Sequence, residues 1–246
     1  MRQLFVLLLL SLVSITGSGS EMDNAAAAMR VGDYAKAYCM MKPLAASGNQ
    51  QAQYTIGWMY HNGYGLRVND NLALEWWQKA SEQGNTDASF AIASLYNQGE
   101  GGVSKNLSKA VDYYLLAAAS HNDDAITILR SMLMRDDKAI QGRKQQLINQ
   151  YGDLLGPRLQ VKANRLNIRQ TPSLQGKIVT RLEHDQPVIE LHRQGKWSQV
   201  GIINSPTDQQ TIAWAYNKLL EPVTNNTNQQ ADPHKPITPT RDTLNQ

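Results

Sequence analysis

An internal repeat of 36 to 37 residues constrains the fold of this 246-residue chain more than any other feature of its sequence. Four landmarks of one copy return 36 residues later in the next: Ala52 and Ala88, Tyr60 and Tyr96, Gly63 and Gly99, and Gly65 and Gly101. The Gly-x-Gly turns therefore belong to a repeating unit, and they lack the strand and further glycines that a phosphate-binding loop needs.

The segments that follow each Gly-x-Gly turn also align. Ala73 and Trp76 match Ala110 and Tyr113 at an offset of 37. Small alanines allow two helices to approach closely, and aromatic residues fill the space between them. The pattern predicts pairs of amphipathic helices joined by a Gly-rich loop. Such pairs bury their apolar faces only by stacking, which indicates an α-solenoid over residues 21–157 with a helix over 139–151 as its cap.

The repeat resembles the Sel1-like family, which is related to tetratricopeptide repeats. The residues of one unit that carry the resemblance are Ala52, Ile56, Gly57, Tyr60, Gly63, Gly65, Asp70, Ala73, Trp76, Lys79, Ala80, Gly84 and Asn85. The next unit departs from the family at Ala93 and His121, where glycine is usual. The resemblance implies a scaffold that binds other proteins. The geometry of a stacked helix array leads to the same expectation, because the array offers an extended concave surface and no preformed catalytic pocket.

Tetratricopeptide geometry places one set of residues on the concave side. The predicted binding residues of this groove are Tyr54, Trp58, His61, Asn62, Phe90, Ser94 and Asn97. Tyr54 and Phe90 have an alternative role as packing between helices, because apolar residues at helical spacing are usually core. Trp58 is the sharpest prediction, since a core position filled by Trp in one unit and Ser in the next would leave a void.

From Leu159 the sequence changes to short β-branched runs separated by Asn, Gly, Pro and Asp. Five expected strands within 158–222 predict a small all-β barrel. The expected strands are residues 166–169, 178–182, 188–192, 197–203 and 211–215. The chain is thus predicted to be multidomain, with an α-solenoid of Sel1-like helix pairs followed by the barrel.

The barrel segment resembles bacterial SH3 domains. The residues that carry this resemblance are Val161, Ala163, Leu166, Asn167, Ile168, Arg169, Pro172, Ser173, Gly176, Leu182, Val188, Trp197 and Val200. Asp185 stands where a turn glycine is usual. The resemblance implies binding of peptidoglycan or short peptides, and the motifs are complete within 158–222, so we expect this segment to fold alone.

Four residues are the predicted binding residues of the barrel: Arg169, Trp197, Trp214 and Tyr216. Both tryptophans have an alternative role in the core, because a small barrel needs large aromatic side chains for packing. The segment 158–222 holds nine Lys and Arg residues against five Asp and Glu residues, which suits an anionic partner without requiring one.

The two ends of the chain have distinct compositions. Residues 1–20 combine Arg2, an apolar run and small residues, which is typical of a cleaved export signal, with an uncleaved anchor as the alternative. We therefore expect a periplasmic protein with no membrane span after cleavage. Residues 223–246 are polar and contain proline, and they are expected to be disordered. Cys39 is the single cysteine, so internal disulfides are excluded.

The sequence contains no recognisable catalytic or metal-binding pattern. Its five histidines form no ligand pair, and it has no nucleophile elbow. We expect a protein that is not an enzyme and binds no cofactor or metal. A net charge of +3 is too balanced for a nucleic-acid binder. The leading hypothesis is an exported adaptor for a protein or peptide. The alternative is an envelope protein that binds peptidoglycan through the barrel.

Overall fold

The computed structural model describes residues 18–135, 140, 142–205 and 211–223. Most of the expected export signal and the expected disordered tail lie outside these residues. The chain forms two compact units, Met1–Ala88 and Ser89–Gln246, which are described separately below.

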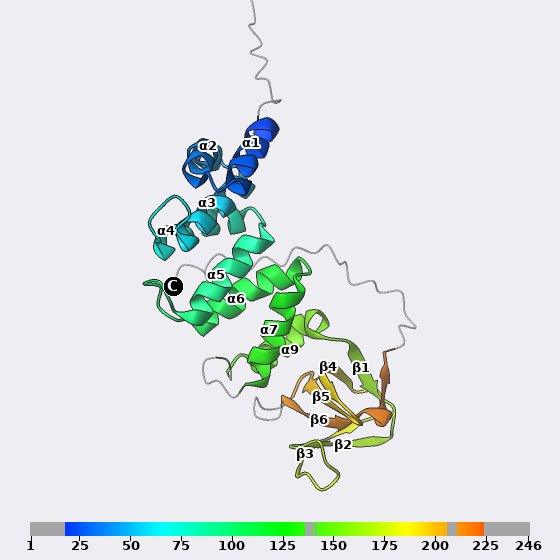
Figure 1. Ribbon diagram of the computed structural model, residues 1–246. Helices are drawn as coiled ribbons and strands as arrows, with labels where there is room; N and C mark the ends of the chain where they lie inside the picture. Colours follow the sequence, from blue (N-terminus) through cyan, green and yellow to red (C-terminus); the bar gives the residue numbers. More distant parts are fainter. Residues whose placement is uncertain (1–17, 136–139, 141, 206–210, 224–246) are drawn as a thin grey trace, which may run out of the picture. The chain divides into compact units, whose positions relative to one another are not determined.

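The first unit is made of helices, which Figure 1 shows in blue to cyan. They are α1 (Ser18–Arg30), α2 (Tyr34–Ala46), α3 (Gln50–Asn62) and α4 (Asp70–Glu82), and α5 (Thr86–Gln98) begins at the end of this unit. α1 packs on α2, α2 on α3, and α3 on α4. Five of the nine residues in one buried cluster are alanine, so the helix backbones approach closely. The nine are Ala25, Ala28, Ala37, Met41, Leu44, Ala45, Ala52, Ile56 and Met59.

Asparagine begins the repeat helices. The side-chain oxygens of Asn49, Asn69, Asn85, Asn106 and Asn122 each accept a hydrogen bond from the backbone N–H three residues later, at 2.8–3.0 Å. Such caps satisfy an amide that the first helical turn leaves without a partner, and each contributes about 1 kcal/mol. The repeated asparagine therefore fixes the start of α3 to α7.

The glycines of the first Gly-x-Gly turn the chain, as the repeat predicts. Gly63 ends α3 with φ 73°, and Gly65 has φ 70°. A Cβ at Gly65 would also lie 2.9 Å from the carbonyl carbon of Tyr34. Only glycine tolerates both the left-handed backbone and this close approach.

Three helices and a sheet complete the second unit. The helices are α6 (Leu107–Ala119), α7 (Asp123–Met134) and α9 (Lys144–Leu155). The last of these replaces the helix expected over 139–151. The strands are β1 (Arg158–Val161), β2 (Arg165–Arg169), β3 (Ile178–Glu183), β4 (Pro187–Gln194), β5 (Trp197–Ile202), β6 (Ile212–Tyr216) and β7 (Leu220–Pro222), with a 3₁₀ turn η2 (Asn217–Leu219).

The seven strands form one antiparallel sheet in the order β3-β2-β6-β5-β4-β1-β7 around a core of its own. The five expected strands correspond to β2 to β6. β1 and β7 were not predicted, because segments of three or four residues are too short to show an alternating pattern. The fold class predicted from the sequence, helix pairs followed by a small β domain, is confirmed.

Helix α9 packs on the outer surface of β4 and β5 through two glycines. A Cβ at Gly201 of β5 would lie 2.5 Å from Ile148 of α9. A Cβ at Gly152 of α9 would lie 2.7 Å from Ile189 of β4, which is fully buried. At each glycine, an isoleucine of the facing helix or strand occupies the space that a side chain would take. The helix therefore lies close against the sheet.

Hydrogen bonds fix the same helix along the strands. The Gln145 side chain donates to the carbonyl oxygen of Ile202 at 3.1 Å and accepts from the Thr211 hydroxyl at 3.0 Å. The Asn149 side chain accepts from the Asn204 amide at 2.9 Å. α9 is thus bound to the sheet by polar as well as apolar contacts.

Two positions where the family resemblances expect glycine keep the glycine conformation. His121 has φ 60° and Asp185 has φ 62°. Short polar side chains tolerate this left-handed region better than most, which explains why the turns survive the substitutions.

Candidate functional site

Three aromatic rings lie in succession in the first unit, with one pair stacked and the other tilted by 35°. Trp58 of α3 stacks on Tyr64 of the following loop, with ring centroids 4.6 Å apart and planes 24° apart. Tyr64 in turn lies 4.5 Å from Tyr34, the first residue of α2. All three residues are half-buried, so each packs on the helices and keeps an accessible part. We refer to Tyr34, Trp58 and Tyr64 as the aromatic stack.

A second aromatic pair lies in the same unit. The hydroxyl groups of Tyr38 and Tyr60 are 3.1 Å apart and hydrogen-bonded. This bond, followed by burial, raises the pKa of Tyr60. The Lys42 ammonium lies 5.5 Å from the centre of the Tyr38 ring, within the range of a cation–π contact. The pair is therefore half-buried and accompanied by a cation.

Two other predicted groove residues of the first unit have partners of their own. His61 lies 2.6 Å from the buried carboxylate of Asp70, and its ring is 5.4 Å from Trp77. Tyr54 is half-buried, and its pKa is raised by burial and by the carboxylate of Asp87. Neither residue has a ring contact with the aromatic stack among the described residues.

Asn62 is exposed, and its amide donates to the Trp58 carbonyl oxygen at 2.9 Å. The repeat alignment singles out Trp58 but gives no sign of the rings that Trp58 and Tyr64 contact. Tyr34 comes from the preceding helix and Tyr64 from the Gly-x-Gly loop, so their meeting depends on tertiary packing. The only local signal was the tyrosine between Gly63 and Gly65.

The predicted groove residues of the second unit surround a buried tyrosine. Tyr114 is 1% exposed, and burial raises its pKa. The Phe90 ring lies 5.6 Å from the Tyr114 ring, and the Ser94 hydroxyl is hydrogen-bonded to the Tyr114 hydroxyl at 3.3 Å. Asn97 is half-buried one turn further along α5. Tyr114 thus takes up space beside Ser94 in this repeat.

The second repeat has no equivalent of the aromatic stack. The residues 36 positions after Trp58 and Tyr64 are Ser94 and Glu100. The stack is therefore specific to the first repeat, although the turn that presents it is common to both. The two repeats therefore differ at these two positions.

On the sheet, the four predicted barrel residues share one outer surface. Arg169 of β2 is paired with Trp214 of β6, and Trp197 of β5 with Tyr216 of β6. Paired residues and residues two apart on a strand point to the same side, and this is the side opposite Ala213 and Ala215 of the core. All four residues are half-buried. We refer to Trp197, Trp214 and Tyr216 as the aromatic strip.

Polar neighbours border the aromatic strip. The Arg169 guanidinium donates to the Gly176 carbonyl oxygen at 2.7 Å. The ring of His192 meets Trp214 edge to face at 6.3 Å, and Trp197 meets Tyr216 in the same way at 5.5 Å. The sequence analysis did not include His192, because a β-bulge in β4 changes which of its residues face outward.

Glu190 of β4 is a partly buried carboxylate that is hydrogen-bonded to Ser198 of β5. Burial raises the pKa of Glu190, but hydrogen bonds from Arg193 and Ser198 outweigh burial and hold it below its ordinary value. The Ser198 hydroxyl donates to this carboxylate at 2.5 Å. Glu190 is therefore an ionised group that joins β4 and β5.

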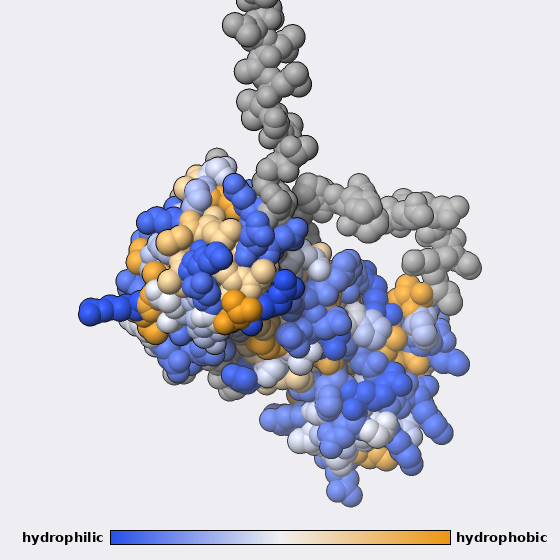
Figure 2. Space-filling view, turned by 45° about the horizontal axis from the view of Figure 1, so that its top comes forward, coloured by the Kyte–Doolittle hydropathy of each residue, from blue (hydrophilic) through white to orange (hydrophobic). Residues whose placement is uncertain are grey.

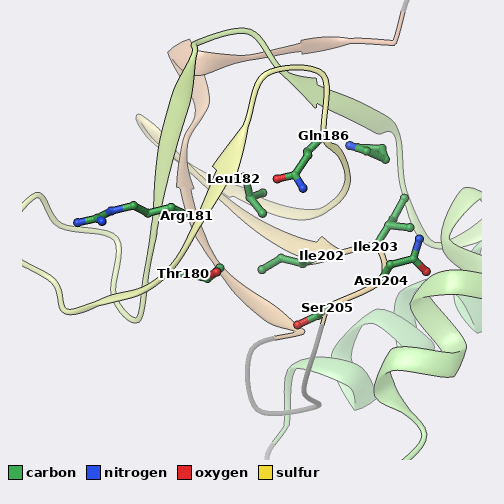
Figure 3. Close-up of a pocket in the computed structure, with 9 residues that line it drawn as sticks. Thr180, Arg181, Leu182, Gln186, Ile202, Ile203, Asn204 and Ser205 are labelled. Atoms are coloured by element: carbon green, nitrogen blue, oxygen red, sulfur yellow. The ribbon is translucent and has the colours of Figure 1, made fainter.

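A small pocket of about 250 Å³ opens between β3, the start of β4 and the end of β5. Leu182, Ile202 and Gln186 surround the opening, whereas Arg181 points away from it (Figure 3). β3 is the last strand on its side of the sheet. The pocket has room for one apolar side chain and contains no pair of catalytic groups.

Ordinary surface chemistry accounts for most of the remaining exposed residues. The face shown in Figure 2 is mostly hydrophilic, with apolar residues in small separate groups. Among the described residues, no three His, Cys, Asp or Glu side chains are arranged to hold a metal ion. In the same part of the chain, no helix has the length and apolar character needed to cross a bilayer.

Comparison with protein families agrees with this arrangement. Models of the Sel1 repeat match residues 50–85 and 86–122, which are α3–α4 and α5–α6, and a model of the bacterial SH3 domain matches residues 164–221. The chain carries two Sel1 repeats and a bacterial SH3 domain. Both resemblances drawn from the sequence are thereby confirmed, and the aromatic stack belongs to the first Sel1 repeat and the helix before it.

Two solved structures are similar to part of this chain. A Sel1 repeat protein from Oxalobacter formigenes is 24% identical, with a TM-score of 0.44 over 55% of this chain and 65% of that one. The protein c5321, a protective antigen present in uropathogenic Escherichia coli strains displaying an SLR fold, is 25% identical, with a TM-score of 0.45 over 53% of this chain and 33% of that one. This chain therefore spans less than two thirds of the length of either protein.

Proposed function

We propose that this chain is an exported, non-catalytic adaptor whose Sel1 repeats bind a protein or peptide and whose SH3 domain makes a second contact. The observation that carries the proposal is the aromatic stack. Half-buried Trp and Tyr side chains supply large contact areas at a small cost in conformational entropy, and they dominate binding energy in many interfaces. The stack is held by three separate segments, so it is preorganised for contact.

The repeat comparison supports the same function. Packing that both Sel1 repeats shared would favour similar residues at the positions of Trp58 and Tyr64 in the second repeat. That repeat has Ser94 and Glu100 there, and Tyr114 packs beside Ser94. A surface that differs between repeats of one fold suits recognition of a particular partner.

Site-specific photocrosslinking tests this proposal. A benzophenone side chain at Tyr64 should give a discrete crosslinked product in an extract of the envelope. The matched control places the same group at Val31, which is in the same unit and 81% exposed. Equal products at both positions, or none at Tyr64, would contradict binding at the stack. Recovery of the chain from a periplasmic fraction without residues 1–20 tests export separately.

A second function is favoured by the aromatic strip. Three aromatic rings on a sheet surface, beside the Arg169 guanidinium, suit stacking against sugar rings that carry an acidic group. The strip thus supports the alternative of a peptidoglycan-binding envelope protein that acts through its SH3 domain. Co-sedimentation with purified sacculi tests it: Trp197→Ala and Trp214→Ala should reduce binding, whereas Trp76→Ala in the repeats should not.

A further inference from the structure

Strand β3 forms one edge of the sheet, and its last residue shows which backbone groups face that edge. In the sheet order, β3 has β2 as its one neighbour. The Glu183 N–H donates to the Gln186 side chain at 2.8 Å, and the Glu183 carbonyl oxygen accepts from the Gln186 amide at 3.3 Å. Both backbone groups of Glu183 therefore point away from β2.

Arg181 has the same orientation and leaves its backbone groups open. In an antiparallel pair, the backbone groups of alternate residues point to the same side, and the register of β2 and β3 is regular from Thr180 to Glu183. The N–H and carbonyl oxygen of Arg181 thus lie on the free edge, and no described residue is hydrogen-bonded to either of them. Arg181 offers two hydrogen bonds to an extended peptide.

The small pocket of the SH3 domain opens beside the same residue. Its lining includes Thr180, Arg181 and Leu182 of β3 and, across the opening, Ile202 and Ile203. Leu182 and Ile202 belong to the buried core of the sheet, so this part of the lining is apolar. The volume of about 250 Å³ is below the roughly 300–1,000 Å³ of most small-molecule sites. The pocket therefore suits a single branched apolar side chain better than a free small molecule.

The outer side of β3 carries positive charge next to the pocket. Glu183 is paired with Arg165 at 3.3 Å, whereas Arg181 and Lys177 have no ion pair within the part of the chain that the structure describes. The Arg181 guanidinium donates to the Asn167 side chain at 3.1 Å and points away from the pocket (Figure 3). An acidic side chain opposite Arg181 balances this charge, because oppositely charged cross-strand pairs are stabilising.

We propose that this edge binds an extended segment of a partner protein by strand addition. The segment pairs with Arg181 through its backbone, carries a carboxylate at the paired position and places the apolar side chain of the adjacent residue in the pocket. Main-chain hydrogen bonds give such a complex its affinity, and pockets for alternate side chains give it specificity. The site is separate from the aromatic stack and the aromatic strip, so the inference goes beyond the proposed function and does not depend on it.

A blocked peptide, acetyl-Ser-Leu-Glu-Leu-Ser-amide, tests the proposal by NMR titration of the full chain. Its glutamate is the residue that pairs with Arg181, and a leucine on each side serves either chain direction. The backbone amide signals of Arg181, Leu182 and Ile203 should shift as the peptide is added. The amide signals of Leu220 and Glu221 in β7, at the other edge of the sheet, should stay in place.

Two altered peptides separate the backbone contact from the pocket. N-methylation of the glutamate removes the N–H that donates to the Arg181 carbonyl oxygen, and it should weaken binding about fivefold or more. Serine in place of both leucines leaves the pocket without an apolar side chain and should weaken binding about tenfold or more. These comparisons use the unmodified chain, so loss of structure in a variant does not confuse them.

Substitutions in the chain provide the second test. Arg181→Glu should weaken binding of the peptide about two- to fivefold, and a peptide with lysine in place of glutamate should recover the loss. Ile203→Trp fills the pocket and should reduce binding, whereas Leu174→Trp, at a residue that is 71% exposed, should not.

Three results overturn the proposal. The first is a peptide that shifts none of the three β3 and pocket signals, or shifts the β7 signals equally. The second is an N-methylated peptide that binds as tightly as the original, because strand addition requires the N–H. The third is an Arg181→Glu chain that shows no preference for the lysine peptide.

Discussion

At one position inside the helix pair, the two Sel1 repeats differ by a single methyl group. The first repeat has Gly57 there, and the second has Ala93. A Cβ at Gly57 would lie 2.5 Å from the Trp77 ring, so the first repeat accepts only glycine there. The second repeat has Ala93 at the equivalent position, and the residue equivalent to Trp77 is Tyr114. A smaller ring leaves room for the methyl group, and the departure from the family pattern at Ala93 is thereby explained.

Gly57→Ala should therefore destabilise the first repeat by about 1–3 kcal/mol, the usual cost of overpacking. The double variant Gly57→Ala, Trp77→Tyr should recover part of this loss, because it reproduces the pair found in the second repeat. Chemical denaturation of the four members of this cycle measures the coupling. If the two losses were simply additive, the explanation of Ala93 would be wrong.

The turn after α6 offers a stabilising substitution. His121 has a positive φ, and a side chain in this region costs about 1–2 kcal/mol, whereas the extra freedom of glycine in the unfolded chain costs about 0.4–1 kcal/mol. His121→Gly should therefore raise the free energy of unfolding by roughly 0.5–1 kcal/mol. His121→Ala serves as the control and should give no gain. A loss of stability in the glycine variant would show that the imidazole makes an essential contact.

The sequence identifies single residues better than it identifies their partners. The repeat alignment shows the difference between Trp58 and Ser94, and the assignment of Trp58 to a binding groove stays a prediction. The stacking of Trp58 on Tyr64 and of Tyr64 on Tyr34 was not visible, because it joins a helix, a loop and the helix before it. Contacts of this kind depend on how elements pack and leave no periodic signal.

Among the elements, α9 changes what the sequence suggests about the SH3 domain. The motifs of that domain are complete within 158–222, which predicts that it folds alone. The structure places Ile189 of β4 under α9 with no exposed surface, and it places Ile148 of α9 against Gly201. The contact could not be predicted from the sequence, because the alternation of residues along a strand does not distinguish an isoleucine that a helix covers from one that faces solvent.

A fragment of residues 142–223 should be more stable than one of residues 158–223. Removal of α9 exposes Ile189, whose burial contributes about 1.5–3 kcal/mol, and it removes the hydrogen bonds of Gln145 and Asn149. Thermal melting of the two fragments gives the comparison. In the longer fragment, Ile148→Ala should lower the melting temperature, whereas Gln150→Ala on the exposed side should not. Equal melting of the two fragments would show that α9 contributes nothing.

At the scale of the whole molecule, the order of helix pairs and strands could be predicted from the sequence because each of these elements depends on a local period. Helices recur with the repeat, Asn caps fix their starts, and alternating residues define β2 to β6. The candidate sites were only half predictable. The aromatic strip lies on one face because its residues alternate along β6, whereas the aromatic stack required knowledge of the packing of three segments. The role that we propose for this stack is to bind a partner.

Two tryptophan variants of the full chain test that claim most directly. Trp58 and Trp76 are both half-buried residues of the first unit and both pack on its core. Each substitution by alanine should therefore reduce stability to a similar extent. Trp58→Ala alone should weaken binding, by roughly 1–3 kcal/mol, because only Trp58 belongs to the stack.

The measurement is calorimetric titration of both variants with the protein or peptide captured by crosslinking at Tyr64, at a temperature where circular dichroism shows that both are folded. We expect an affinity for Trp58→Ala that is about tenfold or more below that of the unmodified chain, and an unchanged affinity for Trp76→Ala. An unchanged affinity for Trp58→Ala, or an equal loss in both variants, would contradict this expectation.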